Sequence, residues 1–176
     1  MNRLAESKVQ VRKAARQDIQ EIVQVSNTSI LPDEDAGFGG GNSPFRLAST
    51  LSAIWKEPNI VRGEEVLVAE LESRIVGVVT VQDRGAELEL VDIDVPLELQ
   101  GRGIGKQLVR AVEKRARDEG KGVVTLGTSR NPDGVAWKSL PWWQHLGYRV
   151  THEEENEWTR SIGPGAREIR MRKELD

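Results

Sequence analysis

The chain lacks cysteine and has little histidine or tyrosine. Of its 176 residues none is cysteine, two are histidine and one is tyrosine. Disulfide bonds, a thiol nucleophile and a cysteine-based zinc site are therefore excluded, because each needs a cysteine sulfur. Two histidines do not suffice for a histidine-rich metal site, and we predict that the protein binds no metal.

Long apolar runs and an excess of positive charge are also absent. No segment approaches the ~20 apolar residues of a membrane-spanning helix, and segment 1–18 is charged throughout, without the apolar centre of a signal peptide. The net charge of −3 gives no general attraction to nucleic acid. We therefore expect a cytoplasmic protein with neither nucleic-acid nor membrane partners. Its length suits one domain, 1–176, with a single core.

The most informative stretch is 87–120. Segment Glu87–Val95 is rich in Leu, Val and Ile and predicts a strand. A glycine-rich turn, Gln100–Gly105, follows it. After the turn, apolar residues recur at the spacing of one helix face until Gly120 ends the helix; they are Ile104, Leu108, Val112 and Ala116.

The glycine-rich turn is typical of an anion site. Its three glycines remove side chains that would keep a ligand away from the backbone. The unpaired N–H groups of the first helical turn, together with the positive end of the helix dipole, favour a phosphate or pyrophosphate. Arg102 and Lys106 add positive charge.

Two familiar phosphate-binding motifs do not fit this turn. A P-loop needs a glycine at position 100 and serine or threonine at position 107, and both are glutamine here. The dinucleotide motif needs a third glycine where the chain has Lys106 or Leu108. The spacing that fits is Gln-x-x-Gly-x-Gly, at Gln100, Gly103 and Gly105.

Between a strand and a long helix, this spacing resembles the acyl-CoA motif of the GNAT superfamily, the acetyl-CoA-dependent N-acetyltransferases. The resemblance covers Val9 to Leu175 and is strongest at Glu87–Gly120 and at Leu146-Gly147-Tyr148. It implies an α/β (mixed α+β) fold with a mostly antiparallel, twisted sheet of about six to seven strands and helices on both faces. The motif strand and the next strand would be parallel and splayed.

The expected elements follow the same order. Strands are expected at 7–13, 65–71, 74–82, 87–95, 122–127, 148–151 and 166–173. Helices are expected at 16–25, 45–55 and 104–119, from Asp133 to Leu140, and over 141–146. Loops are expected at 32–44 and 153–165. The basic residues near the end of the chain are expected to form a solvated face, at Arg160, Arg167, Arg170, Arg172 and Lys173.

The resemblance also implies a site for acetyl-CoA. In that family the backbone of the motif strand holds the pantetheine arm, and a backbone N–H of this strand polarises the thioester carbonyl. The turn binds the pyrophosphate. Carried onto this chain, these roles fall to Ile93, Asp94 and Val95 on the strand, to Gln100, Gly101, Arg102, Gly103, Ile104, Gly105 and Lys106 at the turn, and to Asn131 after the next strand.

Amide formation needs a neutral amine, so a base is expected in the site. The family commonly places a carboxylate on the motif strand, and the corresponding residue here is Glu89, with Glu87 and Asp92 as competitors. Strand alternation places Glu89 on the same face as Val91 and Ile93 unless a bulge intervenes. The alternative for Glu89 is a solvated or ion-paired strand residue.

The proton donor for the departing thiolate is less clearly marked. Many members have a tyrosine three residues before the Leu-Gly-aromatic triplet, and this chain has Trp143 there. An indole is not an acid. Tyr148 falls where the family has a core aromatic residue, so we expect it to pack rather than react. Water, His145 and Ser139 remain as donors.

We therefore interpret the chain as an acetyl-CoA-dependent N-acetyltransferase that acts on a primary amine, with a small molecule as the preferred acceptor. A protein lysine or N-terminus is the alternative acceptor. A non-catalytic acyl-CoA sensor is a further alternative, suggested by the missing tyrosine. The residues that select the amine-bearing partner are expected in loops 26–64 and 151–165, and the resemblance makes a homodimer a common arrangement.

Overall fold

The computed structural model describes residues 8–29, 48–49, 51–52 and 64–176. Our expectation of a loop at 32–44 lies outside these residues. The expected helix at 45–55 also lies outside them, apart from 48–49 and 51–52, which are helical.

The described strands form one sheet of seven in the order β1-β2-β3-β4-β5-β7-β6. Only the β4–β5 pair is parallel, and the other neighbours are antiparallel. The predicted mixed, mostly antiparallel sheet is therefore confirmed. The strands are β1 (Gln10–Lys13), β2 (Glu64–Leu71), β3 (Arg74–Asp83), β4 (Leu88–Asp94), β5 (Val123–Arg130), β6 (Arg149–Glu154) and β7 (Arg167–Glu174).

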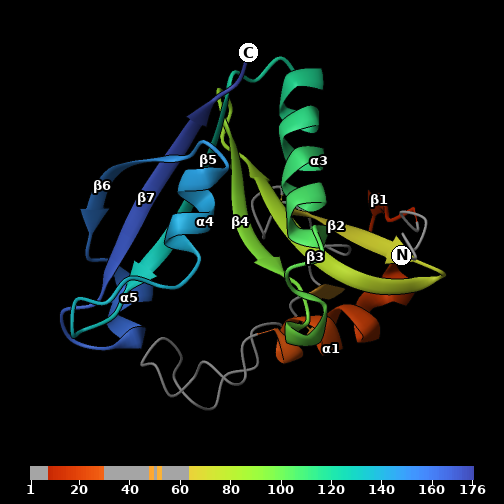
Figure 1. Ribbon diagram of the computed structural model, residues 1–176, viewed down its shortest axis with the longest axis horizontal. Coiled ribbons are helices and arrows are strands. Elements are labelled where there is room, and N and C mark those ends of the chain that lie inside the picture. Colours follow the sequence, from red (N-terminus) through yellow and green to blue (C-terminus); the bar gives the residue numbers. More distant parts are fainter. Residues whose placement is uncertain (1–7, 30–47, 50, 53–63) are drawn as a thin grey trace, which may run out of the picture.

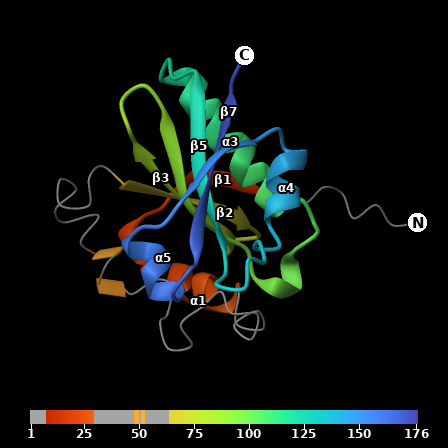
Figure 2. The ribbon, with the colours of Figure 1, turned by 90° about the vertical axis from the view of Figure 1, so that its left-hand side faces the viewer.

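Helices cover both faces of this sheet, as the resemblance implied (Figure 1). They are η1 (Arg16–Asp18), α1 (Ile19–Thr28), η3 (Leu97–Leu99), α3 (Ile104–Asp118), α4 (Leu140–His145) and α5 (Glu157–Ile162). α3 packs on one face, where Leu108 and Val112 join Val79 and Leu126 in the larger core cluster. α1 packs on the other face. In both views α1 and α5 lie toward the same end of the sheet (Figure 2). Among the described residues, no helix has the length and apolar character needed to span a bilayer.

A glycine on β3 lets α3 approach the sheet closely. A Cβ atom at Gly77 would lie 2.9 Å from Leu108 Cδ1 and 3.0 Å from Ile104 Cγ2. A larger residue would force both of these side chains aside. Gly77 therefore allows the first two turns of α3 to pack closely on β3.

Two expectations about connecting segments are wrong. Residues 131–139 form turns rather than the expected helix, because Asn131 Oδ1 accepts hydrogen bonds from the N–H groups of Asp133 (3.0 Å) and Val135 (2.9 Å). Within the expected loop 153–165 lies the short helix α5. Its first turn is closed by Asn156, whose side chain accepts a hydrogen bond from the N–H of Thr159 at 3.0 Å.

Candidate active site

The parallel pair β4–β5 separates halfway along its length. The two strands pair only over Leu88–Leu90 and 124–126, and β5 continues to Arg130 paired with β7 alone. The end of β4, 91–94, thus presents an edge that β5 does not cover. Figure 1 shows the two strands diverging toward the end of the sheet where α1 and α5 lie. This split is the predicted splayed geometry, and an extended ligand can pair with such an edge as an added strand.

The glycine-rich turn lies between the end of β4 and the start of α3. Gly101 and Gly103 have φ angles of +79° and +84°, which L side chains rarely adopt. Gly103 is the N-cap of α3, and its carbonyl accepts the hydrogen bond of Gln107 N–H at 3.1 Å. The N–H groups of the first helical turn have no partner within the helix. The turn thus leaves these N–H groups available, and its role as a phosphate site remains a prediction.

The third glycine of the turn has a different purpose. A Cβ atom at Gly105 would lie 3.3 Å from two ring atoms of Trp142 on α4, which is tighter than most real contacts. Gly105 therefore lets α4 pack against the first turn of α3. We predicted that all three glycines serve the ligand. Positions 101 and 103 are open, and there this stays a prediction, whereas at position 105 the demand comes from packing.

Two predicted cofactor residues use their side chains to brace the fold. Gln100 Nε2 donates to the carbonyls of Val95 (2.9 Å) and Ser29 (3.3 Å). The buried carboxylate of Asp94 accepts hydrogen bonds from the hydroxyls of Ser26 (3.1 Å) and Ser29 (3.0 Å). Both side chains tie the end of β4 to the end of α1. The predicted roles, in holding the pantetheine arm at Asp94 and the pyrophosphate at Gln100, therefore concern the main chain at these positions.

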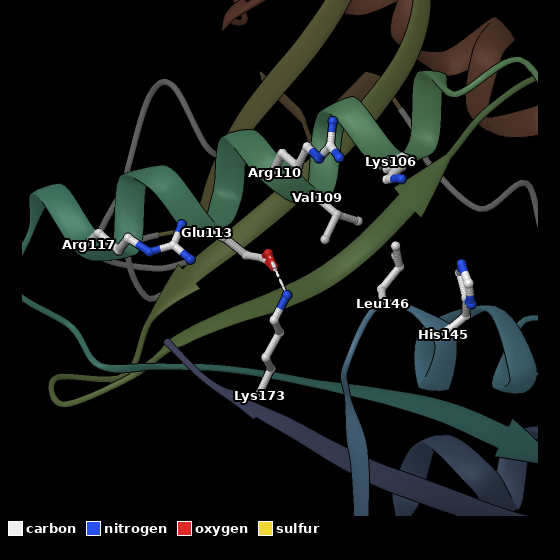
Figure 3. A pocket seen from close by; sticks show the side chains of 8 residues that line it. All are labelled: Lys106, Val109, Arg110, Glu113, Arg117, His145, Leu146 and Lys173. Carbon is white, nitrogen blue, oxygen red and sulfur yellow. Dashed lines mark hydrogen bonds and ion pairs between the residues drawn. The ribbon is translucent and has the colours of Figure 1, made fainter. Parts of the chain in front are cut away.

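A groove of about 390 Å³ runs between α3, α4 and the end of β7 (Figure 3). The buried Glu113 pairs with Lys173 at 2.5 Å on one of its walls. The other charged lining residues are all cationic, so positive charge dominates the groove. Its full lining is Lys106, Val109, Arg110, Glu113, Arg117, His145, Leu146 and Lys173. The groove begins beside the glycine-rich turn, and its charge suits the phosphates of a nucleotide.

Glu89 and Ile93 lie on opposite faces of the sheet. A bulge in β4 pairs Val81 with Leu90 and Thr80 with Asp92, so Val91 has no partner on β3. The bulge breaks the alternation, and Ile93 therefore packs with Leu90 in the core beneath α3. Our expectation that Glu89 shares a face with Ile93 is wrong. The carboxylate is only 6% exposed and faces away from α3.

Both oxygens of Glu89 are held by arginines that the sequence did not mark. Arg84, on the turn after β3, donates to Oε2 through Nε at 2.8 Å and through Nη2. Arg170 on β7 lies 2.6 Å from Oε1 and also contacts Glu168 at 3.0 Å. We expected Arg170 on a solvated face, but its side chain is 21% exposed. The alternation of Ile169 and Met171 in the core could have indicated that Arg170 points to the Glu89 face.

A second cavity, of about 640 Å³, lies on this face opposite α3. Its lining includes Glu89 with both arginines, Glu168, and Trp158 of α5. It also includes Gly127, the first β5 residue beyond the pairing with β4. The cavity thus reaches the split in the sheet from the side opposite the cationic groove.

The two side chains predicted as proton donors lie in different places. Ser139 Oγ lies 3.3 Å from Thr128 Oγ1, on the part of β5 that has left β4. His145 is exposed and lines the groove along α3. Trp143 is 4% exposed and packs edge-on against Tyr148, with ring centroids 5.4 Å apart. Burial raises the pKa of Tyr148, which supports the expected packing role for both rings.

Asn131 follows β5 and is 5% exposed. Its Oδ1 accepts the two backbone hydrogen bonds that shape the 131–135 turn. Its predicted contact with the cofactor remains a prediction.

The comparisons with known proteins agree on one family. The sequence model of the acetyltransferase (GNAT) family matches residues 34–156. Human N-acetyltransferase 8B is 35% identical over 111 residues, which are 60% of this chain and 47% of that protein. The chain therefore spans about half the length of this curated relative.

Solved structures share the fold over nearly the whole chain. An N-acetyltransferase from Staphylococcus aureus superimposes with a TM-score of 0.71 at 18% identity, covering 97% of this chain and 100% of that one. The PaiA N-acetyltransferase from Thermoplasma acidophilum, solved in complex with coenzyme A, gives a TM-score of 0.65 at 17% identity and covers 96% and 99% of the two chains. At these identities the likeness concerns the fold alone.

Proposed function

The chain belongs to the GNAT acetyltransferase family, and on that premise we propose that it transfers an acetyl group from acetyl-CoA to the primary amine of a small molecule. One observation carries the proposal. A β4 edge that β5 does not pair, an open glycine turn at the start of α3 and a cationic groove lie next to one another. Together they offer complementary partners for the pantetheine arm, the diphosphate and the remaining phosphate of coenzyme A.

The donor enters from the α3 side. In this proposal the main chain of Ile93 and Val95 pairs with the pantetheine amides, and the N–H groups at Gly103–Lys106 bind the diphosphate. Lys106 and Arg110 supply charge from the groove. A backbone N–H of β4 polarises the thioester carbonyl, which is the step where negative charge develops on oxygen.

The acceptor enters from the Glu89 side. Amines are mostly protonated at neutral pH, so the bound ammonium must lose a proton before it attacks. Glu89 takes this proton directly or through water, after one of its guanidinium partners has moved aside. Arg84 is the more mobile partner, since its side chain is 47% exposed, against 21% for Arg170.

The bond changes then balance in one displacement. The amine nitrogen forms a C–N bond with the acetyl carbon, and the C–S bond of the thioester breaks. Once the C–N bond has formed, the nitrogen carries one more surplus proton. This proton passes through the hydroxyl of Ser139 to the coenzyme A thiolate, so that the serine ends the step neutral, and Thr128 holds that hydroxyl beside the diverging part of β5. The products are the N-acetylated amine, coenzyme A and the proton released from the ammonium.

The test is release of free thiol from acetyl-CoA with a panel of small amines and of peptides with free lysines or N-termini. The proposal predicts release with small amines. Release with peptides alone would assign a protein acceptor. Tight binding of acetyl-CoA without release on any acceptor would leave a sensor. Ser139→Ala and His145→Ala should be compared directly, since only the former is expected to lower kcat, by about tenfold or more.

A further inference from the structure

We propose that the acceptor is a small aliphatic amine carrying a second positive charge, and that it binds Glu89 in the place that Arg84 occupies in the structure. This inference rests on the proposed function, because it concerns the acceptor side of the same site.

The charge of the acceptor cavity differs from that of the donor groove. Four carboxylates line the cavity, from Glu87, Glu89, Glu154 and Glu168, against the two guanidiniums of Arg84 and Arg170. In the donor groove four cations face the single carboxylate of Glu113. A polyanionic donor and a cationic acceptor are thus each attracted to a different side of the split.

Arg84 already occupies the position that a cationic acceptor needs. Its guanidinium binds Glu89 Oε2, while Arg170 holds Oε1 from the other side. Arg170 is fixed, because it also contacts Glu168 at 3.0 Å and its side chain is 21% exposed. Arg84 has a half-exposed side chain on a turn outside the strands, so its guanidinium can move into solvent. The buried carboxylate of Glu89 then needs another cation in its place. A substrate ammonium can therefore displace it.

The remaining lining favours a second cation on the acceptor. Once the incoming ammonium replaces Arg84, carboxylates still outnumber the cations in the cavity. Trp158, 48% exposed on α5, also lines this cavity, and an indole face attracts a cation. A cavity of about 640 Å³ has room for a short aliphatic chain with two amines. A carboxylate on the acceptor would instead be repelled by the carboxylates that line the cavity.

The experiment compares three acceptors with the same four-carbon chain: 1,4-diaminobutane, n-butylamine and 4-aminobutanoate. Thiol release from acetyl-CoA should give the highest kcat/KM with the diamine, and at least about a tenfold lower value with 4-aminobutanoate. Equal or faster turnover of 4-aminobutanoate would overturn the inference while leaving the transferase activity established.

Variants of Arg84 test the displacement. Arg84→Gln should lower the KM for the diamine about fivefold, because the substrate ammonium no longer competes with a guanidinium for the carboxylate of Glu89. Arg84→Lys should keep the KM near that of the unaltered protein. Arg74→Gln, an exposed arginine at the far end of β3, is the matched control and should change nothing. A raised KM in Arg84→Gln would contradict the inference.

If the proposed function is wrong, no acceptor will cause thiol release. In that case calorimetric titration of 1,4-diaminobutane in the presence of coenzyme A still tests whether the diamine binds at Glu89. Tighter binding to Arg84→Gln than to the unaltered protein supports the site, and no binding to either protein overturns it.

Discussion

Replacement of Gly103 by alanine tests whether the glycine-rich turn binds coenzyme A, separately from its contribution to the free energy of unfolding. Gly103 has a φ angle of +84°, and nothing lies within 4 Å of the position a Cβ atom would take. The substitution therefore adds no clash, only the cost of the left-handed conformation, which is about 1–2 kcal/mol. Gly120, at the other end of α3, offers a matched control: its φ is +72°, and its surroundings are equally open.

Both substitutions should lower the free energy of unfolding by a similar amount, measured by denaturant titration. Their effects on coenzyme A should differ. When Gly103→Ala relaxes its φ angle, the N–H groups at the start of α3 no longer converge on the diphosphate. We expect the dissociation constant of coenzyme A to rise about tenfold, which corresponds to about 1.4 kcal/mol. For Gly120→Ala we expect a change of less than about twofold.

Isothermal titration calorimetry of coenzyme A with both variants is the assay. An equal loss of affinity in the two variants would show that general destabilisation explains the effect. An unchanged affinity in a destabilised Gly103→Ala protein would refute the assignment of the diphosphate to this turn.

Three further predictions concern the catalytic carboxylate, the buried phenol and the packing of the turn. Glu89→Gln should lower kcat about 10²-fold with little change in the KM for acetyl-CoA, and full activity across pH would exclude Glu89 as the base. Burial raises the pKa of Tyr148 above its ordinary value of about 10. The stability from burying the neutral phenol is thus complete below about pH 10 and is lost as the pH rises further. Spectrophotometric titration should show no phenolate in the folded protein, and reversible ionisation near pH 10 would contradict this. Gly105→Ala should lower the free energy of unfolding by about 1–2 kcal/mol, and less in a Trp142→Phe background, since the smaller ring removes the contact; equal losses in both backgrounds would be inconsistent with the packing argument.

The unit from β4 to β5 could be predicted from the sequence because its signals are local. Helical spacing of apolar residues marks α3, glycine marks its two ends, and a run of Leu, Val and Ile marks β4. The parallel pairing follows from the crossover connection. From these local features alone, the acetyl-CoA side of the candidate site could be located along the chain, because no long-range contact is needed to recognise them.

The acceptor side could not be predicted in the same way. A single bulge at Val91 places Glu89 and Ile93 on opposite faces, and alternation along the strand does not show where such a bulge falls. The partners of Glu89 come from the turn after β3 and from β7, the latter 81 positions later in the chain. The packing demand at Gly105 likewise depends on Trp142, which only the fold brings to the start of α3.

The most direct measurement is an amide NMR titration of the isotope-labelled protein with coenzyme A. We expect the largest ¹H and ¹⁵N shift changes at the main-chain N–H groups of Gly101 to Lys106, and smaller changes along the β4 edge from Val91 to Val95. Changes confined to other parts of the chain, or none on saturation with coenzyme A, would contradict it.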